Sequence, residues 1–281
     1  MNRLQTIDRR IIYLVLVLVI VIFILEPIQI PVIPSPQSVD FYNTVVNTPK
    51  NKLVIIGADW SASSKGENDP QTVAVINHLM MLHLKFAILG FDPQGPTLVE
   101  QIANRLAPRY HYVYGVDWID WGFRPPAAMI PLFKAMVQNI PGAVQHDAQG
   151  TPLTDIKRLP IMRGINSIQN VGLLIEITPS NTTDAWIAFL QSVNNTPMLL
   201  CPTSVMAPEA YQYLDSGQLS GMLTGLRGAI EYETLIHRPG YGLKVSPALS
   251  ATHVLIILLI ILGNAGYLLE KRSRRPTRSR E

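Results

Sequence analysis

Short apolar runs recur through the middle of the chain without the alternation of apolar and polar residues that marks a half-exposed strand. Continuous runs of this kind are typical of strands that are covered on both faces, as in parallel sheets. The runs that we interpret as strands are Leu53–Ile56, Phe86–Leu89, His111–Tyr114, Gly172–Ile175 and Met198–Cys201.

Segments of helical length and mixed pattern lie between these runs. The alternation of strand and helix predicts a parallel sheet with helices on both faces. We therefore expect an α/β fold with a Rossmann-like, open and mostly parallel sheet. The helices that we expect are Gln71–Leu84, Thr97–Leu106, Ala127–Ile140, Thr182–Val193 and Pro208–Leu214. Prolines and glycines interrupt residues 121–170, which is typical of a functional connection or of a surface covered by another subunit.

Two longer apolar segments flank this pattern. The 21 residues Leu249–Leu269 are long enough to cross a hydrocarbon core of about 30 Å as a helix. The 15 apolar residues Ile11–Leu25 could belong to a signal peptide or to an anchor. A cleavable signal needs small residues after the apolar run, and none form such a site here. We therefore predict an uncleaved span over residues 11–30.

Basic residues indicate the orientation of these spans. Residues 1–10 contain three Lys or Arg, and residues 270–281 contain six. The positive-inside rule places both termini in the cytoplasm and the intervening domain outside it. The predicted plan is a cytoplasmic N-terminus at 1–10, a span at 11–30, a Pro-rich stalk at 31–39, an extracytoplasmic α/β domain at 40–245, a second span at 249–269 and a basic cytoplasmic tail at 270–281.

Composition narrows the class of protein. Apolar residues make up 48% of the chain and charged residues 15%, so intrinsic disorder of the whole chain is excluded. A single cysteine, Cys201, excludes an intramolecular disulfide framework, and we expect it to be a buried thiol. The first ten residues carry +2 and the last twelve +4, so the net +3 leaves −3 for the rest. The basic charge is thus explained by membrane orientation, and we expect no nucleic-acid partner.

Candidate ligand residues follow the expected strands, because ligands of open parallel sheets bind at the carboxyl ends of the strands. This rule selects Asp59, Trp60, Asp92, Asp117 and Trp118. The three aspartates could converge on a hard cation, or each could cap a turn. We prefer the capping interpretation and expect no metal and no cofactor. Together with Trp121, the tryptophans could line a cleft for a small ligand.

The segment Gly217–Glu233 contains four glycines within twelve residues. They could form the small-residue face of one helix, or a strand could lead through a turn into a helix. Each glycine costs a helix about 1 kcal/mol relative to alanine, so we prefer the strand, turn and helix. The turn could bind an anion with the help of Arg227, although a tight structural turn suffices to explain the glycines.

Small and polar residues interrupt the second predicted span at Gly263, Asn264 and Gly266. An amide in hydrocarbon needs a hydrogen-bond partner, and small residues allow helices to approach closely. We therefore predict a helix contact there, with the first span or with another subunit.

Four motifs together resemble a family of uncharacterised prokaryotic membrane proteins: Ile7–Arg10, Val205–Pro208, Gly217–Glu233 and Gly263–Tyr267. Proteins of that family have one span at each end and an extracytoplasmic α/β domain. The resemblance implies a prokaryotic protein of the inner membrane and implies no activity or catalytic residue.

The resulting expectation is a two-span membrane protein whose outer domain binds a ligand or partner as a scaffold or sensor subunit. Its expected partners are the lipid bilayer and another membrane protein or a second copy of the chain. The alternatives are an extracytoplasmic hydrolase that uses Asp59, Asp92 and Asp117, and a small-ligand receptor domain. We assign no catalytic residue.

Overall fold

The computed structural model of the protein describes residues 8–25 and 31–273. Residues Val32–Gly242 form one compact unit, and the terminal helices belong to a second unit. The helices are α1 (Arg9–Leu25), α2 (Pro36–Val46), η2 (Ala62–Ser64), α3 (Lys65–Met81), α4 (Gly95–Tyr110), η3 (Pro126–Ala128), α5 (Met129–Gln138), α6 (Ile140–Val144), η4 (Pro160–Met162), η5 (Ile168–Asn170), α7 (Thr183–Trp186), η6 (Ile187–Gln191), α8 (Ser192–Asn194), α9 (Ala207–Asp215), α10 (Gly225–Leu235) and α11 (Tyr241–Ser273). The strands are β1 (Leu53–Ala58), β2 (Phe86–Gly90), β3 (Trp118–Phe123), β4 (Val171–Thr178), β5 (Met198–Pro202) and β6 (Gly221–Met222).

The compact unit is built on a six-stranded sheet in the order β3-β2-β1-β4-β5-β6. All neighbouring strands are parallel. The prediction of an α/β fold with a parallel sheet is therefore confirmed. Strand order reverses between β1 and β4, so the connections that leave these strands diverge at their carboxyl ends, where such sheets bind ligands.

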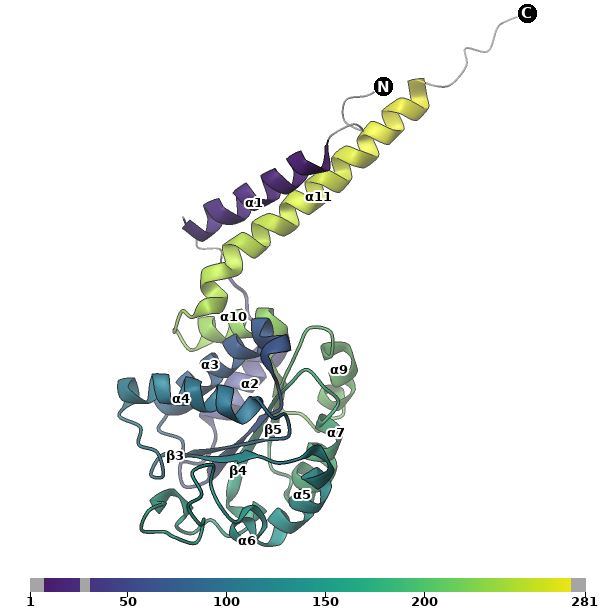
Figure 1. Ribbon diagram of the computed structural model, residues 1–281. Coiled ribbons are helices and arrows are strands. Elements are labelled where there is room, and N and C mark those ends of the chain that lie inside the picture. Colours follow the sequence, from purple (N-terminus) through teal and green to yellow (C-terminus); the bar gives the residue numbers. More distant parts are fainter. Residues whose placement is uncertain (1–7, 26–30, 274–281) are drawn as a thin grey trace, which may run out of the picture. The chain divides into compact units, whose positions relative to one another are not determined.

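Helices cover both faces of the sheet (Figure 1). Helices α2, α3, α4 and α10 lie on one face, and α5, α6, α7 and α9 lie on the other. Along β1 the side chains alternate between two buried clusters: Val54 and Ile56 belong to the cluster with α3, and Leu53 and Ile55 to the cluster with α5. Because both faces are covered, both sets are apolar, and the strand reads as an uninterrupted apolar run.

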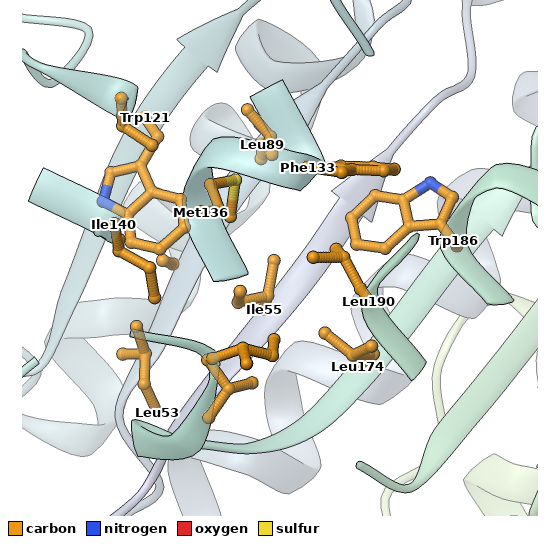
Figure 2. Close-up of a cluster of buried hydrophobic side chains, with 14 of the residues drawn as sticks. Leu53, Ile55, Leu89, Trp121, Phe133, Met136, Ile140, Leu174, Trp186 and Leu190 are labelled. Carbon is orange, nitrogen blue, oxygen red and sulfur yellow. The ribbon is translucent and has the colours of Figure 1, made fainter. Parts of the chain in front are cut away.

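The cluster on the α5 face contains two aromatic rings that lie next to each other (Figure 2). The ring centroids of Phe133 and Trp186 lie 4.8 Å apart. Trp186 lies against Gly57 of β1, and a Cβ atom at Gly57 would lie 2.6 Å from the indole ring. The helical stretch that carries Trp186 passes into a π-helical turn, η6, at Ile187–Gln191. Such turns change the direction in which a helix presents its side chains.

The third strand differs from the prediction. We expected it at His111–Tyr114, but the structure has β3 at Trp118–Phe123. Residues 111–117 form the turn that ends α4: His111 adopts φ +57°, and the carbonyl of Val113 accepts from the amides of Val116 and Asp117. Asp120 and Gly122 interrupt the apolar pattern of the true strand, which explains why that pattern did not reveal it.

The sixth strand and its turn agree with the prediction for Gly217–Glu233. Strand β6 is followed by α10, and Gly225 begins the helix with φ +52°. A Cβ atom at Gly225 would collide with Ser204 and Glu67. The glycine is therefore required both by its left-handed backbone and by the lack of space.

The Pro-rich residues 31–39, which we predicted to be a stalk, belong largely to the compact unit. Helix α2 begins at Pro36, where a proline in the first helical turn costs no hydrogen bond. Phe41 and Val45 of α2 are buried in the core. The side chain of Ser38 is also buried, so the prolines lead directly into the domain.

The terminal helices are described separately from the domain. Among residues 8–25 and 31–273, one helix is long and apolar enough to cross a membrane, the 28-residue stretch Tyr241–Leu268 of α11. At 1.5 Å per residue this stretch is about 42 Å long, and it includes nearly all of the predicted span 249–269. Helix α1 has 17 residues, short of the roughly 20 that a span needs. Residues 26–30 of the predicted first span, and residues 1–7 and 274–281 of the predicted cytoplasmic ends, lie outside the described residues.

The contact between Gly57 and Trp186 can be tested by adding one methyl group. In Gly57→Ala the new Cβ displaces the indole ring, and we expect a loss of about 2 kcal/mol in the free energy of unfolding. The same substitution at exposed Gly66 of α3 meets no atom within 4 Å and should stabilise the helix by about 0.5 kcal/mol. Urea unfolding followed by tryptophan fluorescence measures both. Equal effects at the two glycines would contradict the packing argument.

Candidate functional site

Polar side chains gather at the carboxyl ends of β1 and β4. Asp59 follows β1 and is buried. Its Oδ1 accepts from the backbone amide of Phe91 at 2.5 Å, and its Oδ2 accepts from Nε1 of Trp186 at 3.3 Å. Trp186 reaches Asp59 because it lies over Gly57, which has no side chain. The close packing in the core thus positions the first acid of the site.

Glu176 is the second acid. It lies in β4 in register with Gly57 of β1, so both residues face the α5 side of the sheet. Its side chain is fully buried, and Oε1 accepts from the hydroxyl of Thr182 at 2.6 Å. Oε2 has no hydrogen-bond partner among the described residues. A buried carboxyl oxygen in this state is costly unless the group is protonated or meets a ligand.

Hydroxyl groups connect Glu176 with the surface. The Oγ1 atoms of Thr182 and Thr178 are 3.2 Å apart, and Oγ1 of Thr178 lies 2.9 Å from Oγ of Ser180. Ser180 is exposed. The chain from Glu176 through Thr182 and Thr178 to Ser180 is therefore an unbroken hydrogen-bonded path from a buried carboxyl group to solvent.

Burial raises the pKa of both carboxyl groups. The pKa of Asp59 is raised to about 7 by burial, against the opposing hydrogen bonds from Phe91 and Trp186. The pKa of Glu176 is raised to about 8 by burial and then by the charge of Asp59. Each group disfavours ionisation of the other, so the site can hold protons at neutral pH and release them when a cation approaches.

A small pocket opens beside this path, at the carboxyl ends of β4 and β5. Its lining combines hydroxyl, amide and apolar side chains from β4, β5 and α9 and from the loop after β4. The lining residues are Thr178, Ser180, Asn181, Thr183, Leu200, Pro202, Met206, Glu209, Ala210 and Tyr213.

The tryptophans predicted to line a ligand cleft are core residues. Trp60, Trp118 and Trp121 are at most 1% exposed. Trp118 stacks on Phe86 at a centroid distance of 6.0 Å, and Trp121 packs in the cluster on the α5 face. The expectation of a tryptophan-lined cleft is wrong, because the apolar rings gain more from burial between the sheet and its helices than from solvent contact.

The three aspartates do not form a cluster, and the capping interpretation that we preferred agrees with the contacts of Asp92 and Asp117. Asp92 follows β2 and accepts from the amide of Gln94 at 2.8 Å, which is a turn cap. Asp117 precedes β3 and accepts from the amide of Val113 at 3.0 Å, so it lies at the opposite, amino edge of the sheet. Convergence with Asp59 is thus wrong for Asp117. No three His, Cys, Asp or Glu side chains in residues 8–25 and 31–273 are grouped to hold a metal ion.

Arg227 is engaged within its own helix. Its Nε donates to Oε1 of Glu231 at 2.8 Å, while most of the Arg227 side chain is exposed. Oε2 of Glu231 also accepts from the amide and hydroxyl of Ser35 and from the hydroxyl of Ser38. Burial alone would raise the pKa of Glu231, but these hydrogen bonds outweigh it and hold that pKa below its ordinary value. Arg227 therefore completes a structural cluster.

Helix α10 fastens both ends of the compact unit. Glu231 holds Ser35 near the beginning of the unit, as described above. Glu233, two residues further along the helix, accepts from the amides of Gly240 and Gly242 at 3.0 and 3.1 Å. The first residue of the helix, Gly225, lies against Ser204 after β5. One helix therefore connects the carboxyl edge of the sheet with the first and the last residues of the compact unit.

The predicted helix-contact residues lie on α11. A Cβ atom at Gly263 would meet nothing within 4 Å. Nδ2 of Asn264 donates to the carbonyl of Ile260 at 3.0 Å, so this amide finds a partner in its own helix. Gly266 lies three residues beyond Gly263. The contact with another helix stays a prediction.

Sequence reasoning missed Glu176, the most buried acid of the site. A signal was present, because Glu176 is the only charged residue in the apolar run Val171–Thr178. A charged residue inside a strand that is buried on both faces needs a compensating partner. Cys201, the only cysteine of the chain, is buried as predicted, and burial raises the pKa of its thiol well above the ordinary value.

Comparisons with known proteins found no family model, no curated protein and no solved structure that matches this chain.

The raised pKa values predict how stability depends on pH. Glu176 ionises near pH 4.5 in the unfolded chain and near pH 8 in the folded protein. Its contribution is therefore present in full below about pH 4.5 and is lost as the pH rises to about 8, by up to about 1.4 kcal/mol per pH unit. Thermal unfolding between pH 4.5 and 8.5 should show the wild type losing stability relative to Glu176→Gln, which cannot ionise. A constant difference between the two proteins would contradict the raised pKa.

The cluster at Glu231 makes a second prediction. Glu231→Ala leaves the buried Ser38 hydroxyl without its acceptor and should lower the free energy of unfolding by about 2 kcal/mol. Arg227→Ala removes only the exposed half of the ion pair and should cost about 0.5 kcal/mol. Urea unfolding, with limited proteolysis around residues 32–46, measures both. Similar losses in the two variants would show that the serine contacts contribute nothing.

Proposed function

We propose that the protein is a membrane-anchored binding subunit. In this proposal α11 and the predicted first span hold the chain in the inner membrane of a prokaryotic cell, and the domain Val32–Gly242 faces away from the cytoplasm. The domain binds a ligand or partner and acts as a sensor or scaffold in a membrane assembly. Membership of the family of two-span membrane proteins that the chain resembles is part of the proposal.

The observation that carries the proposal is the helix Tyr241–Leu268. Most of its large apolar side chains beyond Val254 are exposed. Exposed apolar area of this extent is unfavourable in water and favourable in lipid. The fifteen apolar residues of the N-terminal segment and the basic residues beside both segments support two spans with both ends in the cytoplasm.

The structure of α10 supports a role as a sensor. Glu231 and Glu233 contact the residues next to the two predicted spans, and Gly225 lies at the carboxyl edge of the sheet. A ligand that moves the edge can therefore bias the segments that lead to the membrane through one rigid helix. In the proposed assembly, Gly263, Asn264 and Gly266 provide the surface for a second copy or for another membrane protein.

The hydrolase alternative has less support. It requires three strand-end aspartates at one edge, and Asp117 lies at the other edge. The remaining acids, Asp59 and Glu176, are both buried, and burial raises the pKa of Asp59 to about 7 and that of Glu176 to about 8. Both oxygens of Asp59 already accept hydrogen bonds. These features suit a binding site better than a nucleophile.

The orientation can be tested by cysteine labelling, because Cys201 is the only cysteine and is buried. In a Cys201→Ala background, Lys157→Cys in the exposed part of the domain should react with a membrane-impermeant maleimide in intact spheroplasts. Lys271→Cys in the basic tail should react only after detergent is added.

Two outcomes would overturn the proposal. Labelling of Lys271→Cys before Lys157→Cys would reverse the orientation. Recovery of the protein in the soluble fraction after an alkaline carbonate wash would show that α11 does not anchor it.

A further inference from the structure

The pocket at the ends of β4 and β5 lies on the same face of the sheet as Glu176. Thr178 and Leu200 both line it. Leu200 is in register with Glu176 across the two strands, and Thr178 follows Glu176 by two residues. Residues in register, or two apart along a strand, point to the same side of a sheet. Glu176 therefore points to the same side of the sheet as these two lining residues.

The hydroxyl groups of the pocket are polarised by Glu176. Thr182 donates its hydroxyl to Oε1 of Glu176. A hydroxyl has one proton, so a group that donates inwards presents only lone pairs outwards. Because the proton of Thr182 is used in this way, Thr178 can donate to Thr182, and Ser180 can in turn donate to Thr178. The pocket thus offers acceptors to a ligand that carries donors.

The charges around the pocket have one sign. Glu209 is part of the lining, and Tyr213 donates its hydroxyl to Asp184. None of the ten lining residues is Lys, Arg or His. When Glu176 on this face of the sheet is ionised, the electrostatic field in the pocket favours a cation and opposes a carboxylate or phosphate. The pocket is small and admits a group about the size of a water molecule, which is also the size of an ammonium group.

We propose that this pocket binds the ammonium head of a small aliphatic amine, with Glu176 as the buried counter-charge and Thr178, Ser180 and Thr183 as acceptors. An ammonium group has three donors and no acceptor, which matches outward-facing hydroxyl oxygens. The oxygen Oε2 of Glu176, which lacks a protein partner among the described residues, explains why the site carries a buried acid. The inference rests on the proposed role as a ligand-binding domain and names the chemical class of its ligand.

Binding of the cation requires the ionised form of Glu176. The charged or titratable groups near it are Asp59 at the end of β1, Asp184 in α7 and Cys201 in β5, with Glu209 on α9 beside the pocket. Because Glu176 and Asp59 lose their protons only near or above neutral pH, the affinity for an amine should rise as the pH increases from 6 to 8.5. At a pH at which Glu176 is protonated in the free protein, each amine that binds should release one proton.

The test uses the full-length protein in detergent and three probes of equal chain length. Titration calorimetry at pH 8.5 should detect binding of butan-1-amine, and neither butan-1-ol nor butanoate should bind measurably. Equal binding of the alcohol would show an apolar site without charge selectivity and would overturn the proposal. Binding of butanoate in preference to the amine, or no binding of the amine at millimolar concentration, would also overturn it.

Matched variants locate the site. Glu176→Gln keeps the size of the side chain and should weaken amine binding by about tenfold or more, because a charge-assisted interaction is lost, and the dependence on pH should flatten. Glu209→Gln, at an exposed position that folding does not require, should weaken binding by about threefold. Asp40→Asn, an exposed acid in α2 outside the pocket, should leave it unchanged.

Equal affinities in all three variants would place the amine elsewhere and refute the assignment. If cysteine labelling agrees with the proposed topology but the amine does not bind, the proposed ligand class is refuted. The proposal of a membrane-anchored domain is then unaffected.

Discussion

The pairing of β1 with β4 in register, with Gly57 beside Glu176, is the constraint on which the functional edge depends. The absence of a side chain at Gly57 lets the ring of Trp186 lie against the sheet. From there its indole N–H reaches Asp59, and the following π-helical turn continues the segment that covers the edge. A Cβ atom at this one position would lie 2.6 Å from the indole ring and would displace it. Core packing and site geometry are therefore set by the same contact.

Two carboxyl groups buried on one face of a sheet would be strongly destabilising as a pair of charges. The protein reduces that cost because burial raises the pKa of Asp59 to about 7 and that of Glu176 to about 8. Hydrogen bonds from Phe91, Trp186 and Thr182 satisfy three of their four oxygens. The fourth oxygen, Oε2 of Glu176, has no hydrogen-bond partner among the described residues. In the proposed amine site, ionisation of Glu176 would link ligand binding to proton release.

Helix α10 contacts both this edge of the sheet and the two ends of the compact unit. It begins at Gly225 against the loop after β5 and carries Glu231 and Glu233, which bind the backbone of Ser35 and of Gly240 and Gly242. The prolines suggested a stiff stalk before the domain. Instead, residues from Val32 onwards belong to the compact unit, and Ser35 is held by Glu231.

The pattern of apolar residues sufficed to predict the fold class, most helices and five of the six strand positions. Short continuous apolar runs such as Leu53–Ile56 are typical of strands that are covered on both faces, so they indicate local burial. It failed at β3, because Asp120 and Gly122 broke the apolar pattern while the turn at 111–114 imitated it.

Only the tertiary structure decided which polar residues meet. Asp59 and Glu176 are far apart in sequence, and strand order and register, which are set by packing across the whole sheet, bring them to one edge and send Asp117 to the other. The tryptophans show the same limit, since Trp60, Trp118 and Trp121 stand at strand ends in the sequence and yet are buried. The local pattern of apolar residues indicates how deeply a residue is buried. Which other residues it contacts depends on the pairing of strands that are far apart in sequence.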